Sequence, residues 1–159
     1  MNFIIHPIDP TLRERIQPIL DATWRGPFLA INGKLWDSRV MPGYAALREG
    51  EILGYILYVF HPDACEIMVL HSLAENGGVA TALIEEAKGQ VKAEGVAKII
   101  VQTSNDNTRA FRFYQRRGFV LREIRLGAIA RSRAVKPVIP LTGRDGIPLR
   151  DEIEFEIHL

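Results

Sequence analysis

The sequence predicts a single α/β domain, in which a mixed sheet carries helices on both of its faces. Three observations support this class. Short apolar segments typical of strands recur through the second half of the chain. Two helical segments, residues 79–94 and 106–117, are placed between those strands. The last segment, residues 153–159, alternates apolar and polar side chains, as a half-buried strand does.

The length and composition indicate one globular domain. The chain has 159 residues, of which 47% are hydrophobic and 25% are charged. No apolar run approaches the ~20 residues that span a bilayer, and the N-terminus reaches Asp9 without the apolar segment of a signal peptide. The single cysteine, Cys65, excludes an internal disulfide. We therefore expect a cytoplasmic protein that does not associate with membranes.

The N-terminal region is predicted to contain a strand, a helix and a hairpin. Asp9-Pro10 supplies an N-cap and a favoured first helical residue, and Pro18 is expected to kink or split the helix that follows. Asn32-Gly33 is suited to the tight turn of a hairpin. The predicted strands of this region are Phe3–Ile5, Phe28–Ile31 and Lys34–Trp36.

From residue 44 onward, strands and helices alternate. The helix over residues 79–94 ends at Gly95, and the helix over residues 106–117 ends at Gly118. The predicted strands are Tyr44–Arg48, Ile52–Phe60, Cys65–Leu73, Lys98–Gln102, Phe119–Leu126 and Ile153–Leu159. The connection over residues 127–150 is rich in proline and glycine, and we expect a long loop there that is functional or disordered.

The charges are unevenly distributed, although the net charge is only +1. Nine basic residues lie between Arg109 and Lys136, and Glu123 alone opposes them there. Residues 151–156 carry four acidic side chains. Both segments fit solvated surfaces, but they also fit an anionic ligand near the first segment and a cationic ligand near the second.

Two motifs indicate the chemistry. Residues 75–83 read E-N-G-G-V-A-T-A-L and place two glycines directly before a helix. Residues 107–119 read N-T-R-A-F-R-F-Y-Q-R-R-G-F. Together they resemble the two signature motifs of the GNAT superfamily of acyl-CoA-dependent N-acetyltransferases, a pyrophosphate turn Q/R-x-x-G-x-G/A and the later pattern N-x-x-A-x-x-F-Y-x-x-x-G-F. The later pattern matches at Asn107, Ala110, Phe113, Tyr114, Gly118 and Phe119.

The first motif matches at Gly78 and Ala80 but has Glu75 where the family has Gln or Arg. The resemblance covers residues 44–159 well and the first forty residues loosely. It implies one acyltransferase domain over residues 1–159, with a mostly antiparallel sheet, one splayed pair of parallel strands, and acetyl-CoA as cosubstrate. It also implies direct transfer of the acetyl group to a primary amine in a ternary complex. The four histidines show no metal-ligand spacing, so we expect no metal.

The turn before the first motif's helix is suited to a pyrophosphate, because a helix N-terminus leaves its first N–H groups unpaired. A plain glycine-rich loop is the alternative for this segment taken alone. A carboxylate 4 Å from a phosphate charge costs ~1 kcal/mol in water, so we expect the Glu75 side chain to point to solvent. The predicted contacts of this turn are Glu75, Asn76, Gly77, Gly78, Val79, Ala80 and Thr81.

The resemblance places the pantetheine arm between two splayed strands, equivalent here to residues 65–73 and 98–102. The backbone of Val69, Leu70 and His71 would then pair with its amides, and ordinary ladder pairing is the alternative. Asn107 fits a helix cap, a cofactor contact or both. Ala110, Phe113 and Tyr114 complete the predicted cofactor residues.

Tyr114 is expected to carry the chemistry, because in the family a tyrosine at this place puts its phenol near the thioester sulfur. Tyrosine titrates near 10 and a thiol near 8.5, so full proton transfer to the thiolate is uphill by about 2 kcal/mol. This difference suits a general acid or a hydrogen-bond donor to the departing sulfur. Packing of Tyr114 beside Phe111 and Phe113 is the alternative.

A lysine-like acceptor amine must also lose a proton, which costs roughly 4.6 kcal/mol at pH 7. Glu66 and His71 are the candidate bases, and a structural role is the alternative for each. Cys65 lies on an apolar strand and is predicted to be a core residue.

The acceptor is expected to be a small-molecule or protein amine, recognised near the acidic last strand and the loop over residues 127–150. One alternative is a non-catalytic acyl-CoA sensor or interaction module. Another is a nucleic-acid-binding module that uses the arginines, but the strands lack the interleaved aromatic residues of such modules, so we expect no nucleic-acid partner. Exposed strands and a long loop are compatible with a homodimer.

Overall fold

The computed structural model describes residues 2–159, which form two compact units. The first unit contains residues 2–27, 38–99 and Leu159, and the second contains residues 28–37 and 100–158. In the first unit the elements are β1 (Ile4–Pro7), α1 (Pro10–Trp24), β4 (Gly43–Arg48), β5 (Glu51–Phe60), β6 (Cys65–Ser72) and α2 (Val79–Ala93). In the second they are β2 (Phe28–Ile31), β3 (Lys34–Asp37), α3 (Thr108–Gln115), β8 (Val120–Arg125), α4 (Ala128–Val135) and β9 (Glu152–His158). The strand β7 (Lys98–Ser104) begins in the first unit and continues into the second.

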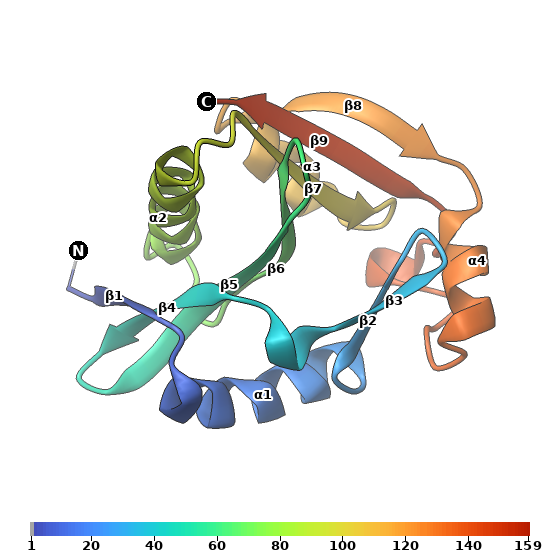
Figure 1. The fold of residues 1–159 in the computed structure, drawn as a ribbon. Coiled ribbons are helices and arrows are strands. Elements are labelled where there is room, and N and C mark those ends of the chain that lie inside the picture. Colours follow the sequence, from blue (N-terminus) through green and yellow to red (C-terminus); the bar gives the residue numbers. More distant parts are fainter. Residues whose placement is uncertain (1) are drawn as a thin grey trace. The chain divides into compact units, whose positions relative to one another are not determined.

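The strands of the main sheet follow the order β1-β4-β5-β6 in the first unit and β7-β9-β8 in the second (Figure 1). β2 and β3 form a separate two-stranded sheet. Single turns of 3₁₀ helix lie at Ser38–Val40 and Arg144–Gly146. The mixed sheet and its four helices confirm the predicted α/β class. Within residues 2–159, no helix is long and apolar enough to cross a membrane.

The first helix forms where the sequence predicts it. The expectation that Pro18 could split this helix is wrong, since α1 is continuous through Pro18. The Asp9 side chain caps its start, accepting the Leu12 N–H at 2.8 Å. Pro18 cannot donate to the carbonyl of Glu14, but both residues are exposed, so water can satisfy that carbonyl. The buried face of the helix consists of Leu12, Ile16 and Leu20.

In the first unit the two helices lie on opposite faces of the sheet. Cross-strand partners share a face, so Tyr55 on β5 and its partner His71 on β6 point one way, and Gly54 points the other way. The ring of Trp24, at the end of α1, contacts His71 edge-on. α2 packs on β4, β5 and β6, and its first residue, Val79, lies against Gly54. The expectation of helices on both faces is therefore confirmed for this unit.

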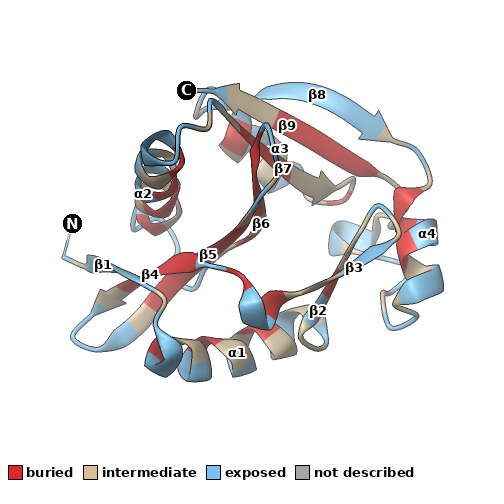
Figure 2. Cartoon of the chain, viewed as in Figure 1, coloured by how far each residue is buried: buried red, intermediate tan, exposed pale blue. Residues whose placement is uncertain are grey.

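The second unit contains the predicted hairpin and a core built from aromatic residues. Residues 28–31 pair with residues 34–37, and Asn32 and Gly33 adopt the positive φ angles of the turn, 48° and 77°. β9 pairs antiparallel with β8, and α3 packs on β8. Phe155 of β9 is fully buried and contacts the rings of Phe111 and Tyr114. Figure 2 shows that β9 is largely buried, whereas β8 is exposed along most of its length.

The expectation of a long loop over residues 127–150 is wrong for its first part, because α4 occupies residues 128–135. Gly127 begins this helix with φ 70°, and the helix buries Ala128, Ile129 and Ser132 and packs on β2 and β3. The remainder carries a single β-bridge between Thr142 and Pro148. The prolines of this segment lie after the helix, so its helical character was hidden by the composition of the connection as a whole.

Two residues before α3, Asn105 and Asp106, form hydrogen bonds that hold the connection between α4 and β9 in place. Asn105 accepts the N–H groups of Arg150 and Asp151 at 2.9 and 3.1 Å. Asp106 is 4% exposed, accepts the hydroxyl of Ser104, and accepts the N–H of Arg144 at 2.9 Å. These two side chains were not singled out from the sequence, although they stand immediately before the second motif.

Candidate functional site

The glycine turn that precedes α2 leaves backbone N–H groups without acceptors in the part of the chain that the structure describes. Asn76 and Gly78 have φ angles of 58° and 72°, and Gly78 is the N-cap residue with no side-chain capping bond. The first helical hydrogen bond is donated by Ala82 to the carbonyl of Gly78 at 3.0 Å. Within the described residues the N–H groups of Val79 and Ala80 therefore have no acceptor, which is the arrangement that binds an anion at a helix start.

The two glycines of this turn serve different purposes. Gly78 needs its positive φ, a conformation that costs a residue with a Cβ roughly 1 kcal/mol or more. Gly77 has no such angle, and a Cβ there would meet only Val79 Cγ2 at 3.8 Å, which is an ordinary contact. Glu75 is exposed, as expected.

Close packing between α2 and β5 holds this turn in place. Gly54 lies under the first residue of α2, and a Cβ at Gly54 would meet His71 O at 2.6 Å and Val79 Cγ1 at 2.8 Å. Val79 is 2% exposed. The start of the helix therefore depends on the absence of a side chain at Gly54, which the sequence pattern did not reveal.

A bulge in β6 brings both candidate bases to the same face of the sheet. Leu57 pairs with Val69 and Tyr58 pairs with Ile67, so Met68 is the extra residue. In a regular strand Glu66 and His71 would point to opposite faces, because they are an odd number of positions apart. With the bulge, their partners are Val59 and Tyr55, which share one face.

The two candidate bases are nevertheless well separated. Val59 and Tyr55 are four residues apart on β5, a distance of ~13 Å at the rise of an antiparallel strand. Glu66 and His71 therefore lie at two separate positions along this face. The backbone of Val69, Leu70 and His71 pairs with β5 along one edge, and its contact with a pantetheine arm stays a prediction.

His71 lies in an aromatic environment that favours its neutral form. Its ring makes edge-on contacts with Trp24 and Tyr55, each with ring centroids 5.4 Å apart, and its Nδ1 lies 3.2 Å from the Tyr55 hydroxyl. Burial lowers the pKa of His71. Burial first, and then the negative charge of Asp21, raise the pKa of Tyr55, so this phenol stays protonated. A neutral imidazole is the form that accepts a proton.

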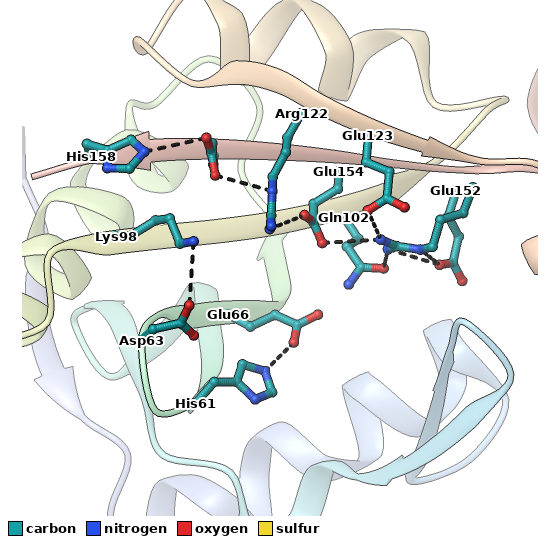
Figure 3. A network of polar contacts seen from close by, with 12 residues as sticks. His61, Asp63, Glu66, Lys98, Gln102, Arg122, Glu123, Glu152, Glu154 and His158 are labelled. Atoms are coloured by element: carbon teal, nitrogen blue, oxygen red, sulfur yellow. Dashed lines mark hydrogen bonds and ion pairs between the residues drawn. The ribbon is translucent and has the colours of Figure 1, made fainter.

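Glu66 lies beside a histidine that the sequence did not connect with it. Its Oε2 is 2.6 Å from Nε2 of His61, which follows β5 in the turn to β6 (Figure 3). The Glu66 side chain is 5% exposed and that of His61 is 31% exposed, so the imidazole connects the buried carboxylate with solvent. Cys65 is 1% exposed, and burial, followed by the charge of Glu66, raises its pKa to about 12. This is a core thiol, as predicted.

Tyr114 is buried in the second unit. Its ring contacts those of Phe113, Phe119 and Phe155, so the packing alternative is correct in kind, although Phe119 and Phe155 take the place that Phe111 was expected to fill. Burial raises the pKa of Tyr114 well above its ordinary value. The phenol therefore stays protonated and can donate a hydrogen bond.

The other fixed positions of the second motif have clear structural roles. Asn107 caps α3, accepting the Ala110 N–H at 3.2 Å. Phe113 lies under the guanidinium of Arg117, whose Cζ is 3.5 Å from the ring centroid. Gly118 takes a φ of 86° where the chain leaves the helix, and the next residue is 2% exposed. The cap expected for Asn107 is confirmed, and its contact with a cofactor stays a prediction.

The basic segment and the acidic last strand pair with one another. Arg125 binds Glu152 at 3.3 Å and Glu154 at 3.2 Å, and it also donates to Gln102. Arg122 binds Glu154 at 2.7 Å (Figure 3). Both glutamates are 4% exposed. The expectation of solvated faces is wrong for these residues, because the two strands that carry them are neighbours and their charges neutralise each other.

Other arginines of this segment also have partners within the second unit. Arg131 donates to Leu126 O and Asn32 Oδ1 at 3.1 Å, and Arg133 donates to the carbonyls of Pro140 and Leu149. The basic segment therefore serves largely to hold α4 and the connection after it in place. No cluster of three His, Cys, Asp or Glu side chains among residues 2–159 is placed to hold a metal ion.

Comparisons with known proteins agree with this arrangement. The model of the acetyltransferase (GNAT) family matches residues 11–119. YxbD of Bacillus subtilis (strain 168) is 35% identical over 154 residues, which cover 96% of each chain.

Solved structures have the same fold at lower identity. A GNAT family acetyltransferase from Elizabethkingia anophelis with acetyl-CoA bound has a TM-score of 0.71 at 19% identity, over 99% of both chains. An acetyltransferase from Bacillus subtilis in complex with CoA has a TM-score of 0.69 at 15% identity, covering 99% of this chain and 98% of its own.

Proposed function

Because the chain belongs to the GNAT family of acetyltransferases, we propose that it transfers the acetyl group of acetyl-CoA directly to a primary amine. The amine nitrogen forms a bond to the acetyl carbon while the carbon–sulfur bond breaks. One proton of the ammonium form leaves through a base to solvent, and a second proton of the nitrogen ends on the CoA thiol. The acceptor is a small molecule or a protein amine.

The observation that carries this proposal is the glycine turn at the start of α2. A diphosphate needs several N–H donors in one concave array, and the amides of residues 76–80 offer them at the positive end of a helix dipole. The neighbouring structures from Elizabethkingia anophelis and Bacillus subtilis contain acetyl-CoA and CoA, which supports the same ligand here. Exposed Glu75 opposes the anion weakly, since solvent screens it.

Tyr114 is the proposed donor to the departing sulfur. Its ring is fixed by three aromatic neighbours, so the position of its phenol oxygen is fixed as well. The raised pKa of Tyr114 makes full proton transfer to a thiolate more uphill than ordinary values imply. Hydrogen-bond donation to the developing negative charge is therefore the favoured role.

Either Glu66 or His71 receives the proton of the acceptor. His71 can do so at Nε2 only in the tautomer whose Nδ1–H is donated to the Tyr55 hydroxyl. Glu66 would pass the proton to the partly exposed ring of His61. Because the two are ~13 Å apart along the strand, Glu66→Gln and His71→Gln should affect the pH–rate profile very differently.

The test is turnover of acetyl-CoA against a panel of primary amines, followed as release of free thiol. We expect amine-dependent thiol release that Tyr114→Phe reduces while CoA affinity is retained. CoA binding without thiol release for any amine in the panel would instead support a non-catalytic acyl-CoA sensor. Absence of CoA binding would overturn the proposal entirely.

A further inference from the structure

β8 ends the strand order of the sheet, and one of its edges is open. Its apolar residues are far more exposed than those of an internal strand, with Val120 at 57%, Leu121 at 47% and Ile124 at 52%. Leu126, which follows the strand, is 75% exposed. An open edge with apolar side chains is a template for pairing with another strand.

The register with β9 divides the side chains of β8 between two faces. Leu121 pairs with Phe155 and Ile124 with Ile153, so both lie on the apolar face. Glu123 and Arg125 lie on the charged face, opposite Glu154 and Glu152. Arg122 is the extra residue of a bulge, and its guanidinium also reaches Glu154 on that face.

The four central side chains of β8, residues 121–124, are complementary to themselves when the strand is reversed. The strand reads V-L-R-E-I-R. In an antiparallel pair centred between residues 122 and 123, Arg122 lies opposite Glu123 of the second copy, and Glu123 lies opposite Arg122. Leu121 then lies opposite Ile124 on the apolar face in both halves of the pair. Opposite charges and paired apolar side chains are each favourable across antiparallel strands.

We propose that two copies of this chain associate through β8, related by a two-fold axis that passes between residues 122 and 123. The contact is isologous, so every pair occurs twice and the association closes as a dimer. Charges on an edge strand ordinarily keep copies apart, but in this register each Arg122 lies opposite a Glu123 of the other copy. The dimer also covers the exposed Leu121 and Ile124 side chains of both copies.

The experiment measures molar mass by light scattering across micromolar concentrations for the full chain. We expect the wild type to show twice the chain mass. Arg122→Glu and Glu123→Arg each place like charges opposite one another twice, so each alone should raise the dimer dissociation constant about tenfold. Mixing the two variants restores opposite charges at both positions, and the mixture should return to the dimer mass.

Control variants distinguish a loss of β8 pairing from a general effect of the altered charge. Arg116→Glu makes the same change in charge at an exposed site outside β8 and should leave the dimer intact. If Arg122→Glu does not fold, the mixture of Leu121→Glu with Ile124→Lys tests the same register, since it places those two charges opposite each other. A wild type that remains monomeric throughout, or a dimer that neither single charge change weakens, would overturn the proposal.

Discussion

The substitution Gly54→Ala tests how the fold holds the glycine turn. The new Cβ would lie 2.6 Å from His71 O, 2.8 Å from Val79 Cγ1 and 3.2 Å from Ser72 Cα, and two of these three atoms belong to the backbone. The two backbone atoms belong to β6 and cannot rotate aside, and the third atom belongs to Val79, the buried first residue of α2. Both β6 and the start of α2 must therefore move away from Gly54. Overpacking of this kind typically costs ~1–3 kcal/mol, which lowers the melting temperature by roughly 2–12 °C in a chain of this size.

The same movement should weaken CoA binding, because the displaced helix start carries the proposed amide donors. Loss of one hydrogen bond to a charged oxygen, worth about 1.5 kcal/mol, corresponds to a roughly tenfold rise in the dissociation constant. Thermal unfolding measures the first effect and titration calorimetry with CoA measures the second.

Gly89→Ala is the matched control on the same helix. A Cβ at Gly89 meets nothing within 4 Å, so alanine should stabilise the helix by ~0.5–1 kcal/mol and leave CoA affinity unchanged. If Gly54→Ala melts with the wild type and binds CoA equally well, the close packing of α2 on β5 does not position the turn, and the reasoning fails.

Four further predictions follow from individual side chains. Tyr114→Phe keeps the aromatic packing, so stability should be unchanged while kcat for acetyl transfer falls ~10²-fold; an unchanged kcat would remove the hydroxyl from the mechanism. Arg125→Met leaves two buried glutamates without their buried partner and should cost ~3–5 kcal/mol in urea unfolding, more than Arg122→Gln at a half-exposed site. Burial lowers the pKa of His71, so its neutral form contributes stability that is present above about pH 6.5 and is lost as the pH falls through the lowered pKa. In His71→Gln the fall in melting temperature between about pH 7.5 and 5 should therefore be smaller than in the wild type. Glu75→Gln should tighten CoA binding by up to about fivefold at low ionic strength and less at high salt, whereas no change at low salt would show that the carboxylate lies too far from the diphosphate.

The sequence was most informative where local chemistry determines local structure. Asp9 and Asn107 cap the helices that they were expected to begin, and Asn32-Gly33 forms its turn. The glycine turn at the start of α2 was also located correctly. In each case one or two residues fix the backbone through a capping bond or a positive φ angle, so neighbours in sequence suffice.

The sequence was least informative where the outcome depends on which strands become neighbours. Nothing in the sequence indicates that Met68 is the extra residue of a bulge. The shared face of Glu66 and His71 could therefore not be predicted. The pairing of Arg125 with the acidic residues of β9 likewise follows from the sheet order. Two opposite runs of charge do carry a signal for such pairing, although that alternative was not drawn from the sequence.

The second motif combines residues that stabilise the fold with a side chain, Tyr114, whose hydroxyl the fold does not require. A cap, a turn glycine and aromatic packing account for Asn107, Gly118 and Phe119 within the fold itself. The aromatic contacts of Tyr114 are made by its ring and do not require its hydroxyl. It is therefore the atom of this motif for which a functional explanation is needed most.

The most direct test of the central claim is an NMR titration of the ¹⁵N-labelled chain with CoA. We expect the amide signals of Gly77, Gly78, Val79 and Ala80 to shift most, and to shift with one common dissociation constant. Free diphosphate should move the same signals more weakly. If CoA binds while these four amides stay unperturbed, the glycine turn is not the diphosphate site and the proposed placement of the cofactor is wrong.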